Sequence, residues 1–157
     1  MVETSTRPIT AADLEQVVAI DRANTGQSRR HFFEKRFATA KARPSDYVQV
    51  GVTDNEGLRG FAIAHIQRGE FGQKDAVAVL DALGVAPLNR EHGFGHNLME
   101  ALIAAARQRG AKSVQSQVDW QNAELMRFFN NVGFALAPRL ALERTAADLP
   151  EQAEDEP

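Results

Sequence analysis

The sequence predicts one α/β domain built on a mixed (α+β type) β-sheet, and three observations support this fold class. The 157 residues suit a single domain with a hydrophobic core of its own. Residues 77–85 form an apolar run with the length of a buried strand, and an amphipathic helical pattern follows over residues 93–110. Residues 47–53 and 58–67 have strand-like patterns on either side of the turn sequence D-N-E-G, which predicts a hairpin.

The composition excludes several classes of protein. It is 43% hydrophobic and 25% charged, as in ordinary globular domains, and the net charge of −3 gives no broad positive field for nucleic acid. The absence of cysteine excludes disulfides, thiolate metal sites and a cysteine nucleophile. No apolar run approaches the roughly 18 residues of a membrane helix, and the N-terminus lacks a signal-peptide core. We therefore expect a cytoplasmic protein without nucleic-acid or membrane partners.

The N-terminal part of the chain predicts one edge strand and two helices. Residues 4–9 have the pattern of a short strand that tolerates a proline at a sheet edge. Thr10 begins the sequence T-x-x-D, a capping box that predicts a first helix directly after it. Ser28 is expected to cap a second helix, which ends before Pro44.

The C-terminal part predicts a strand, a helix and two short final strands. Residues 113–118 alternate in polarity, and Asn122 is expected to cap a helix that Gly133 closes. Residues 134–137 and 140–144 are then expected to form two short strands. The predicted order is therefore β-α-α-β-β-β-α-β-α-β-β.

The glycine loop R-E-H-G-F-G at residues 90–95 stands between the apolar strand and the long helix. Its two glycines, Gly93 and Gly95, fall at the helix N-terminus, where free N–H groups and the helix dipole favour an anion. Without side chains they allow a bulky anion close to the backbone. Arg90 adds a forked, charged set of donors. The loop predicts a diphosphate site.

Two common phosphate-binding motifs do not fit this loop. A Rossmann dinucleotide fingerprint requires a third glycine where Leu98 stands, and a P-loop requires Gly-Lys-Ser/Thr, which is absent. A helix start eased by glycine, with no ligand, remains a simpler alternative. The pattern that the loop does contain is R-x-x-G-x-G directly after a V-x-P turn.

This combination resembles the GNAT acetyltransferase superfamily, whose acetyl-CoA pyrophosphate loop follows the pattern Q/R-x-x-G-x-G/A. A second match lies in residues 122–134, where an asparagine begins a segment that ends in Gly-Phe, and the order of elements matches over residues 4–145. The resemblance implies a domain over residues 1–146 with a bulged central strand. The acidic residues 147–157 are expected to form a disordered tail.

The resemblance also implies a function. We expect an acyl-CoA-dependent N-acetyltransferase that moves an acetyl group from acetyl-CoA directly to a primary amine in a ternary complex. The acceptor is expected to be a small molecule, a peptide or a protein, and a homodimer is a possible assembly. An acetyl-CoA-binding regulatory module with little or no turnover is the alternative.

By resemblance, the acetyl-CoA site takes its residues from the central strand, the glycine loop and the helix after the fifth strand. Asn122 is expected to contact the pantetheine arm, although a plain N-cap is an equal alternative. Phe129 stands where many relatives have a tyrosine that protonates the thiolate, and a phenyl ring cannot donate a proton. The expected contacts are Leu83, Gly84, Val85, Arg90, Glu91, His92, Gly93, Phe94, Gly95, His96, Asn122 and Phe129.

Amine acetylation also needs a proton acceptor, for which four acidic residues are candidates. One of them, Asp21, ends the first helix and could face the acceptor, although solvation at the helix surface accounts for it more simply. Asp81 interrupts the apolar strand, and a lone carboxylate there is costly unless it has a partner or a role. A structural hydrogen bond is the equal alternative for Asp81. Asp119 and Glu70 follow strands, where turn chemistry or solvation accounts for them at least as well. His65 is expected to be structural.

The remaining charged residues give weaker indications. His92 and His96 have a spacing that permits a metal pair, but no third ligand is evident, so no metal is expected. The basic second helix, with Arg29, Arg30 and Lys35, suggests an acceptor that carries a carboxylate or phosphate, although solvation accounts for these charges more simply.

Overall fold

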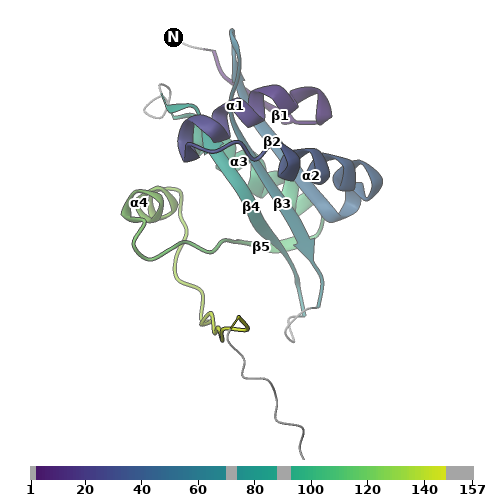
Figure 1. Cartoon of the computed structure of the whole chain (residues 1–157). Helices are drawn as coiled ribbons and strands as arrows, with labels where there is room; N and C mark the ends of the chain where they lie inside the picture. The colour runs from purple at the N-terminus through teal and green to yellow at the C-terminus, as the bar shows by residue number, and fades with distance from the viewer. Residues whose placement is uncertain (1–2, 70–73, 88–92, 148–157) are drawn as a thin grey trace, which may run out of the picture.

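The computed structural model describes residues 3–69, 74–87 and 93–147, which form one five-stranded sheet with helices on both faces. The strand order is β1-β2-β3-β4-β5, antiparallel except for the parallel pair β4–β5. Helices α1 and α2 cover one face and α3 the other (Figure 1). The elements are β1 (Ser5–Pro8), η1 (Ala11–Asp13), α1 (Leu14–Thr25), α2 (Arg30–Ala42), η2 (Pro44–Asp46), β2 (Tyr47–Asp54), β3 (Gly57–Gln67), β4 (Ala76–Val85), α3 (Phe94–Gln108), β5 (Ala111–Gln115) and α4 (Ala123–Asn131).

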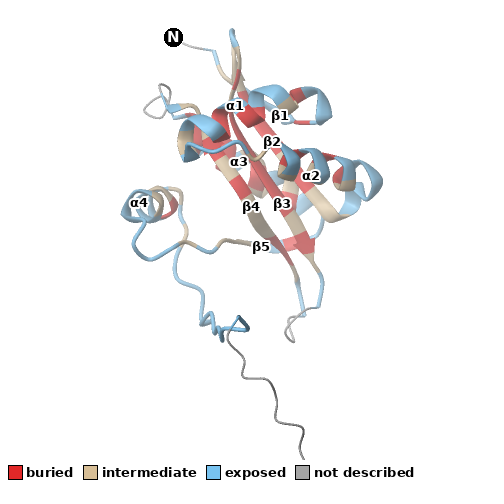
Figure 2. Cartoon of the chain, in the orientation of Figure 1, coloured by how far each residue is buried: buried red, intermediate tan, exposed pale blue. Residues whose placement is uncertain are grey.

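Alternation along β3 divides the apolar side chains into two cores. Phe61 and Ile63 pack toward α1 and α2, whereas Ala62 and Ala64 face α3. All four side chains are fully buried, and the buried residues concentrate on the strands between the helices (Figure 2). The predicted mixed α/β fold is therefore confirmed, together with the order of elements from the first strand to the helix after the fifth.

The first helix begins as the capping box predicts, but the second does not. Thr10 accepts a hydrogen bond from the N–H of Ala12, and Asp13 accepts one from the N–H of Thr10. Ser28, by contrast, is not the N-cap of α2, which begins at Arg30 without a side-chain cap. The guanidinium of Arg29 turns instead to α1, where the buried carboxylate of Asp21 accepts two hydrogen bonds from it.

The bulge in the central strand falls at Asp81. Ile63 of β3 lies opposite Ala82 and the next residue lies opposite Leu80, so Asp81 is the extra residue in the ladder. Gly84 pairs in register with Phe61. A Cβ on Gly84 would lie 2.8 Å from Cε1 of that buried ring, so the glycine provides space for Phe61.

Strands β4 and β5 run together over only part of β4. Their register extends from Ala76–Ala111 to Val79–Gln115, where β5 ends and the chain turns toward α4 (Figure 1). Strand β5 is therefore shorter than the predicted 113–118. Within the described residues, the second half of β4 has β3 on one side and no strand on the other.

The two final strands predicted at residues 134–137 and 140–144 are wrong for this chain. The described residues after α4 form no strand. Three leucines of the segment, Leu136, Leu140 and Leu142, are 101%, 88% and 90% exposed. A strand requires a neighbour that pairs with its backbone, and within these residues the segment has none.

We predict that Gly84→Ala destabilises the fold. The added methyl group meets Phe61, whose ring is held edge-on by Phe33 at 5.5 Å between centroids. Overpacking of this kind lowers the free energy of unfolding by about 1–3 kcal/mol. Urea denaturation measures it, and Phe61→Leu serves as the matched background in which the penalty should shrink. Equal penalties in both backgrounds would show that Phe61 is not the reason for the glycine.

Candidate active site

The N-terminus of α3 is open toward solvent and is not capped by a side chain. Gly93 is the N-cap and has φ +76°, in the left-handed region that favours glycine, with no atom within 4 Å of the position of a Cβ. The first intrahelical backbone bond runs from the N–H of Asn97 to the carbonyl of Gly93. The first turn of the helix therefore provides donors and the positive end of its dipole to an anion. His96 is exposed beside it.

Helix α4 packs against the start of α3. Gly95 is buried, and a Cβ there would lie 2.7 Å from Cε2 of Phe128. Next to that ring lies Phe129, which is 6% exposed and whose ring centroid is 4.8 Å from that of Phe134. Phe129 thus fills the apolar interface of α4 and provides no group that could donate a proton.

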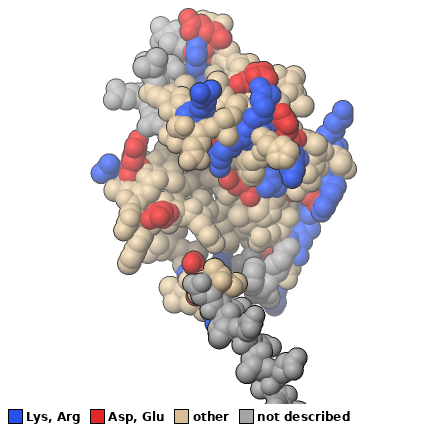
Figure 3. Space-filling view, viewed as in Figure 1, with Lys and Arg blue, Asp and Glu red and all other residues tan. Residues whose placement is uncertain are grey.

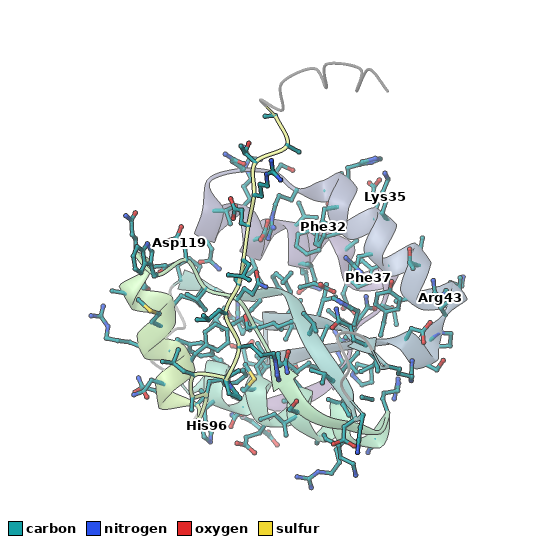
Figure 4. All side chains as sticks on the ribbon, turned by 90° about the horizontal axis from the view of Figure 1, so that it is seen from below. Phe32, Lys35, Phe37, Arg43, His96 and Asp119 are labelled. Carbon is teal, nitrogen blue, oxygen red and sulfur yellow. The ribbon has the colours of Figure 1, made fainter. Side chains whose placement is uncertain are left out.

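The loop before α4 contains two predicted site residues, both in local hydrogen bonds. A carboxylate oxygen of Asp119 accepts from the N–H of Gln121 at 2.9 Å, and Oδ1 of Asn122 accepts from the N–H of Leu125 at 3.1 Å. These are turn and N-cap contacts. Asp119 lies beside α4, on the other side of the molecule from Lys35 of α2 (Figure 4).

Asp81 has a partner that the sequence patterns did not indicate. Both of its carboxylate oxygens approach Nδ1 of His65 on β3, at 2.8 and 2.9 Å. A guanidinium nitrogen of Arg36, from α2, lies 3.5 Å from the same carboxylate. The side chains of Asp81, His65 and Arg36 are 14%, 29% and 23% exposed, so the group is partly open to solvent.

Long-range pairing is the reason that His65 was missed. Residue 65 lies opposite Val79 in the β3–β4 ladder, and Asp81, two residues after Val79, lies on the same side of the sheet. The sequence shows the alternation of each strand, but the register that brings the two side chains together is not visible in it.

The structure places several more of the predicted site residues. Leu83 lies opposite Ala62 and packs in the core on the α3 side. The carbonyl of Val85 accepts a hydrogen bond from the side-chain amide of Asn24 at 3.0 Å, which ties the end of β4 to α1. Glu70, Arg90, Glu91 and His92 lie outside the described residues. In residues 3–69, 74–87 and 93–147, no three His, Cys, Asp or Glu side chains form a potential metal site.

The basic residues at the start of α2 have carboxylate partners. Arg29 pairs with Asp21 at 2.6 Å and Arg30 with Glu15 at 2.5 Å. These contacts raise the pKa of each guanidinium above its ordinary value, mainly through the hydrogen bond from the arginine to the carboxylate. Positive and negative side chains alternate over this face of the molecule (Figure 3). The two arginines thus give little support to an anionic acceptor.

None of the helices in the described parts of the chain has the length and apolar character needed to cross a membrane.

Solved structures with similar folds include several acetyltransferases. A transcriptional regulator from Bacillus halodurans C-125 superposes with a TM-score of 0.76 at 20% identity, over 91% of this chain and 99% of that one. Aminoglycoside N-acetyltransferase AAC(6')-Iy, bound to a CoA bisubstrate analogue, gives 0.75 at 17% identity, over 91% and 98%. Glucosamine-6-phosphate N-acetyltransferase from Arabidopsis thaliana gives 0.68 at 14% identity, over 92% and 99%.

No curated protein sequence matches the chain significantly. The acetyltransferase (GNAT) family model, in contrast, matches residues 14–134, from the start of α1 to the segment after α4. This range contains the uncapped α3 terminus, the bulged β4 and the diverging β5. The chain belongs to the GNAT acetyltransferase family.

Proposed function

We propose that this protein is an N-acetyltransferase that moves an acetyl group from acetyl-CoA directly to a primary amine in a ternary complex. The observation that carries the proposal is the uncapped N-terminus of α3, which follows the half of β4 that β5 leaves unpaired. A diphosphate suits the N-terminus of α3, and an extended pantetheine arm suits the unpaired half of β4.

The residues proposed to hold acetyl-CoA come from these two elements. Gly93, Gly95 and His96 are assigned to the diphosphate, because they belong to the uncapped first turn of α3 and the open N-cap at Gly93 admits a bulky anion. The backbone of Leu83, beside Gly84, is assigned to the thioester carbonyl, which it would polarise and position. The backbone of Val85, whose carbonyl accepts a hydrogen bond from the side-chain amide of Asn24, is assigned to the same contact. Positioning of two substrates supplies most of the rate gain.

An acetyl-CoA-binding regulatory module is the alternative function. Phe129 favours it, because this buried phenyl ring cannot protonate the departing thiolate. Two experiments separate the functions: calorimetric titration with acetyl-CoA, and a thiol-release assay with an aminoglycoside, glucosamine-6-phosphate and a peptide with a free N-terminus. Binding with turnover of at least one amine supports the enzyme. Binding without turnover supports the regulatory module, and no binding contradicts both.

We predict that His96→Glu weakens acetyl-CoA binding roughly tenfold, because it places a negative charge at the proposed diphosphate site. The fold should tolerate the change: the side chain is 63% exposed, and an acidic residue suits the first turn of a helix. Calorimetry at low and high salt measures the effect, which should shrink as salt screens it.

The matched control is His31→Glu on α2. His31 is 81% exposed and, like His96, lies one turn before a glutamate, so the change in charge and neighbour is equivalent. The control should bind acetyl-CoA like the wild type. If the two variants bind equally, the assignment of the α3 terminus to the diphosphate is contradicted.

We further propose a homodimer in which residues 134–147 of each copy pair with β5 of the other. The exposed leucines of this segment alternate at Leu140 and Leu142, as in a strand with one apolar face. Strand β5 ends the sheet, and within the described residues its outer edge is unpaired. The outer edge of β5 in each copy would thus pair with residues 134–147 of the other copy. Two such pairings form a closed two-fold dimer.

Light scattering after size-exclusion chromatography tests the dimer. The wild type should have twice the chain mass of 17.2 kDa, and Leu136→Ser with Leu140→Ser and Leu142→Ser should be a monomer. Trp120→Ser is the control, since Trp120 is also 84% exposed but lies outside the segment. A wild type of 17.2 kDa contradicts the proposal.

A further inference from the structure

The contact between His65 and Asp81 gives the active site a proton acceptor. We infer that His65 takes the proton from the acceptor amine and that Asp81 is a positioning residue that orients the imidazole. This inference rests on the proposed acetyltransferase function and revises the expectation that Asp81 is itself the base. Its basis is the pair of distances, 2.8 and 2.9 Å, between Nδ1 of His65 and the carboxylate oxygens.

The contacts of the two ring nitrogens define one tautomer. Asp81 has only acceptor oxygens, so Nδ1 of His65 carries the hydrogen and donates it. On the other side of the ring, Nε2 lies 3.3 Å from the side-chain nitrogen of Gln67, which is a donor. Nε2 is therefore the unprotonated nitrogen, and its lone pair faces an N–H group. An acceptor amine that replaces this long contact would place its own N–H toward the same lone pair.

The surroundings of the imidazole are charged and aromatic. The titratable and charged groups that face it are Asp81 from β4, Arg36 from α2 and Tyr47, its partner in the β2–β3 ladder. The guanidinium of Arg36 lies over the rings of Phe32 and Tyr47, at 5.4 and 5.3 Å from their centroids. This packing holds Arg36 beside the carboxylate, so the carboxylate is fixed from two sides while the imidazole keeps 29% of its surface exposed.

The pair lies close to the proposed transfer site. Asp81 precedes Leu83 by two residues, which is about 7 Å along a strand. Asp81 faces α2, on the side of β4 opposite the α3 core into which Leu83 packs. In the inferred arrangement, an amine that enters from the α2 side approaches the thioester carbonyl along the face that holds Asp81 and His65, and water can complete the path of the proton.

The proposed step is balanced. The nitrogen of the neutral amine attacks the thioester carbon, a C–N bond forms and the C–S bond breaks. The proton lost by the nitrogen moves to Nε2 of His65. The CoA thiolate leaves and takes a proton from water, and the imidazolium returns its proton to the solvent. This series of steps needs no proton donor at the position of Phe129.

The test compares His65→Asn with the wild type. Asparagine places its amide near the position of Nδ1, so it can still donate to Asp81, but it has no basic nitrogen. With acetyl-CoA and the best amine of the panel, kcat/KM for the amine should fall about 100-fold or more, and the acidic limb of its pH profile should disappear. Affinity for acetyl-CoA and the urea midpoint should change little. His31→Asn, at an exposed histidine of α2, should behave like the wild type.

Asp81→Asn tests the positioning role. The variant loses the carboxylate that orients the imidazole, so kcat should fall while KM for the amine changes little and part of the activity remains. A ¹⁵N spectrum of labelled wild type should show the Nδ1–H tautomer of His65, independently of turnover. Full activity and an unchanged pH profile in His65→Asn would overturn the inference alone. A wild type that binds acetyl-CoA but acetylates no amine would overturn the proposed function, and the inference with it.

Discussion

The separation of β4 from β5 is the constraint on which the rest of the molecule depends. The two strands pair in parallel from Ala76–Ala111 to Val79–Gln115, and beyond that point β4 continues with β3 alone. A parallel pair normally hides the backbone of both strands. Here half of β4 keeps one edge of its backbone available, and the glycine start of α3 follows that edge in the chain. An extended ligand with an anionic end suits this arrangement.

The middle of β4 adds chemistry to this geometry. Asp81 lies on the same face of the strand as Val79, the partner of His65 in the ladder, and its carboxylate meets His65 and Arg36 there. Because of the bulge, Ala82 also lies on this face, and the alternation continues from it in the opposite sense, so that Leu83 faces α3. Because Leu83 packs on the α3 side, the two faces of β4 serve different purposes. One face packs in the α3 core, and the other holds the proposed base on the side from which the acceptor is proposed to enter.

Local patterns were sufficient for most of the fold. The strands β2, β3 and β4 and the helix α3 were predicted to within one or two residues, because alternation, turn residues and helical periodicity are properties of neighbouring residues. Features that depend on pairing were not predicted. The bulge belongs to the register of two strands, so its position at Asp81 could not be predicted, and Gly84 serves to admit the ring of Phe61.

The same distinction applies to the candidate site. Asp81 could be selected from the sequence because it interrupts an apolar run, whereas its partner is 16 residues away and depends on the hairpin register. The final strands were predicted from their apolar residues, but Leu136, Leu140 and Leu142 have no neighbour within the described chain that would complete a sheet. The ion pair of Asp21 and Arg29 was missed for the same reason, since it joins two helices.

A crystal structure of the protein with bound CoA tests the central claim most directly. We predict that the diphosphate lies at the first turn of α3, beside Gly93 and Gly95, and that the pantetheine arm lies along the unpaired edge of β4 with its sulfur near Leu83. His65 should face the side of β4 opposite the α3 core and remain free of the cofactor. CoA bound elsewhere, for example in the surface groove between α1 and the start of α2, would contradict the proposed cofactor site.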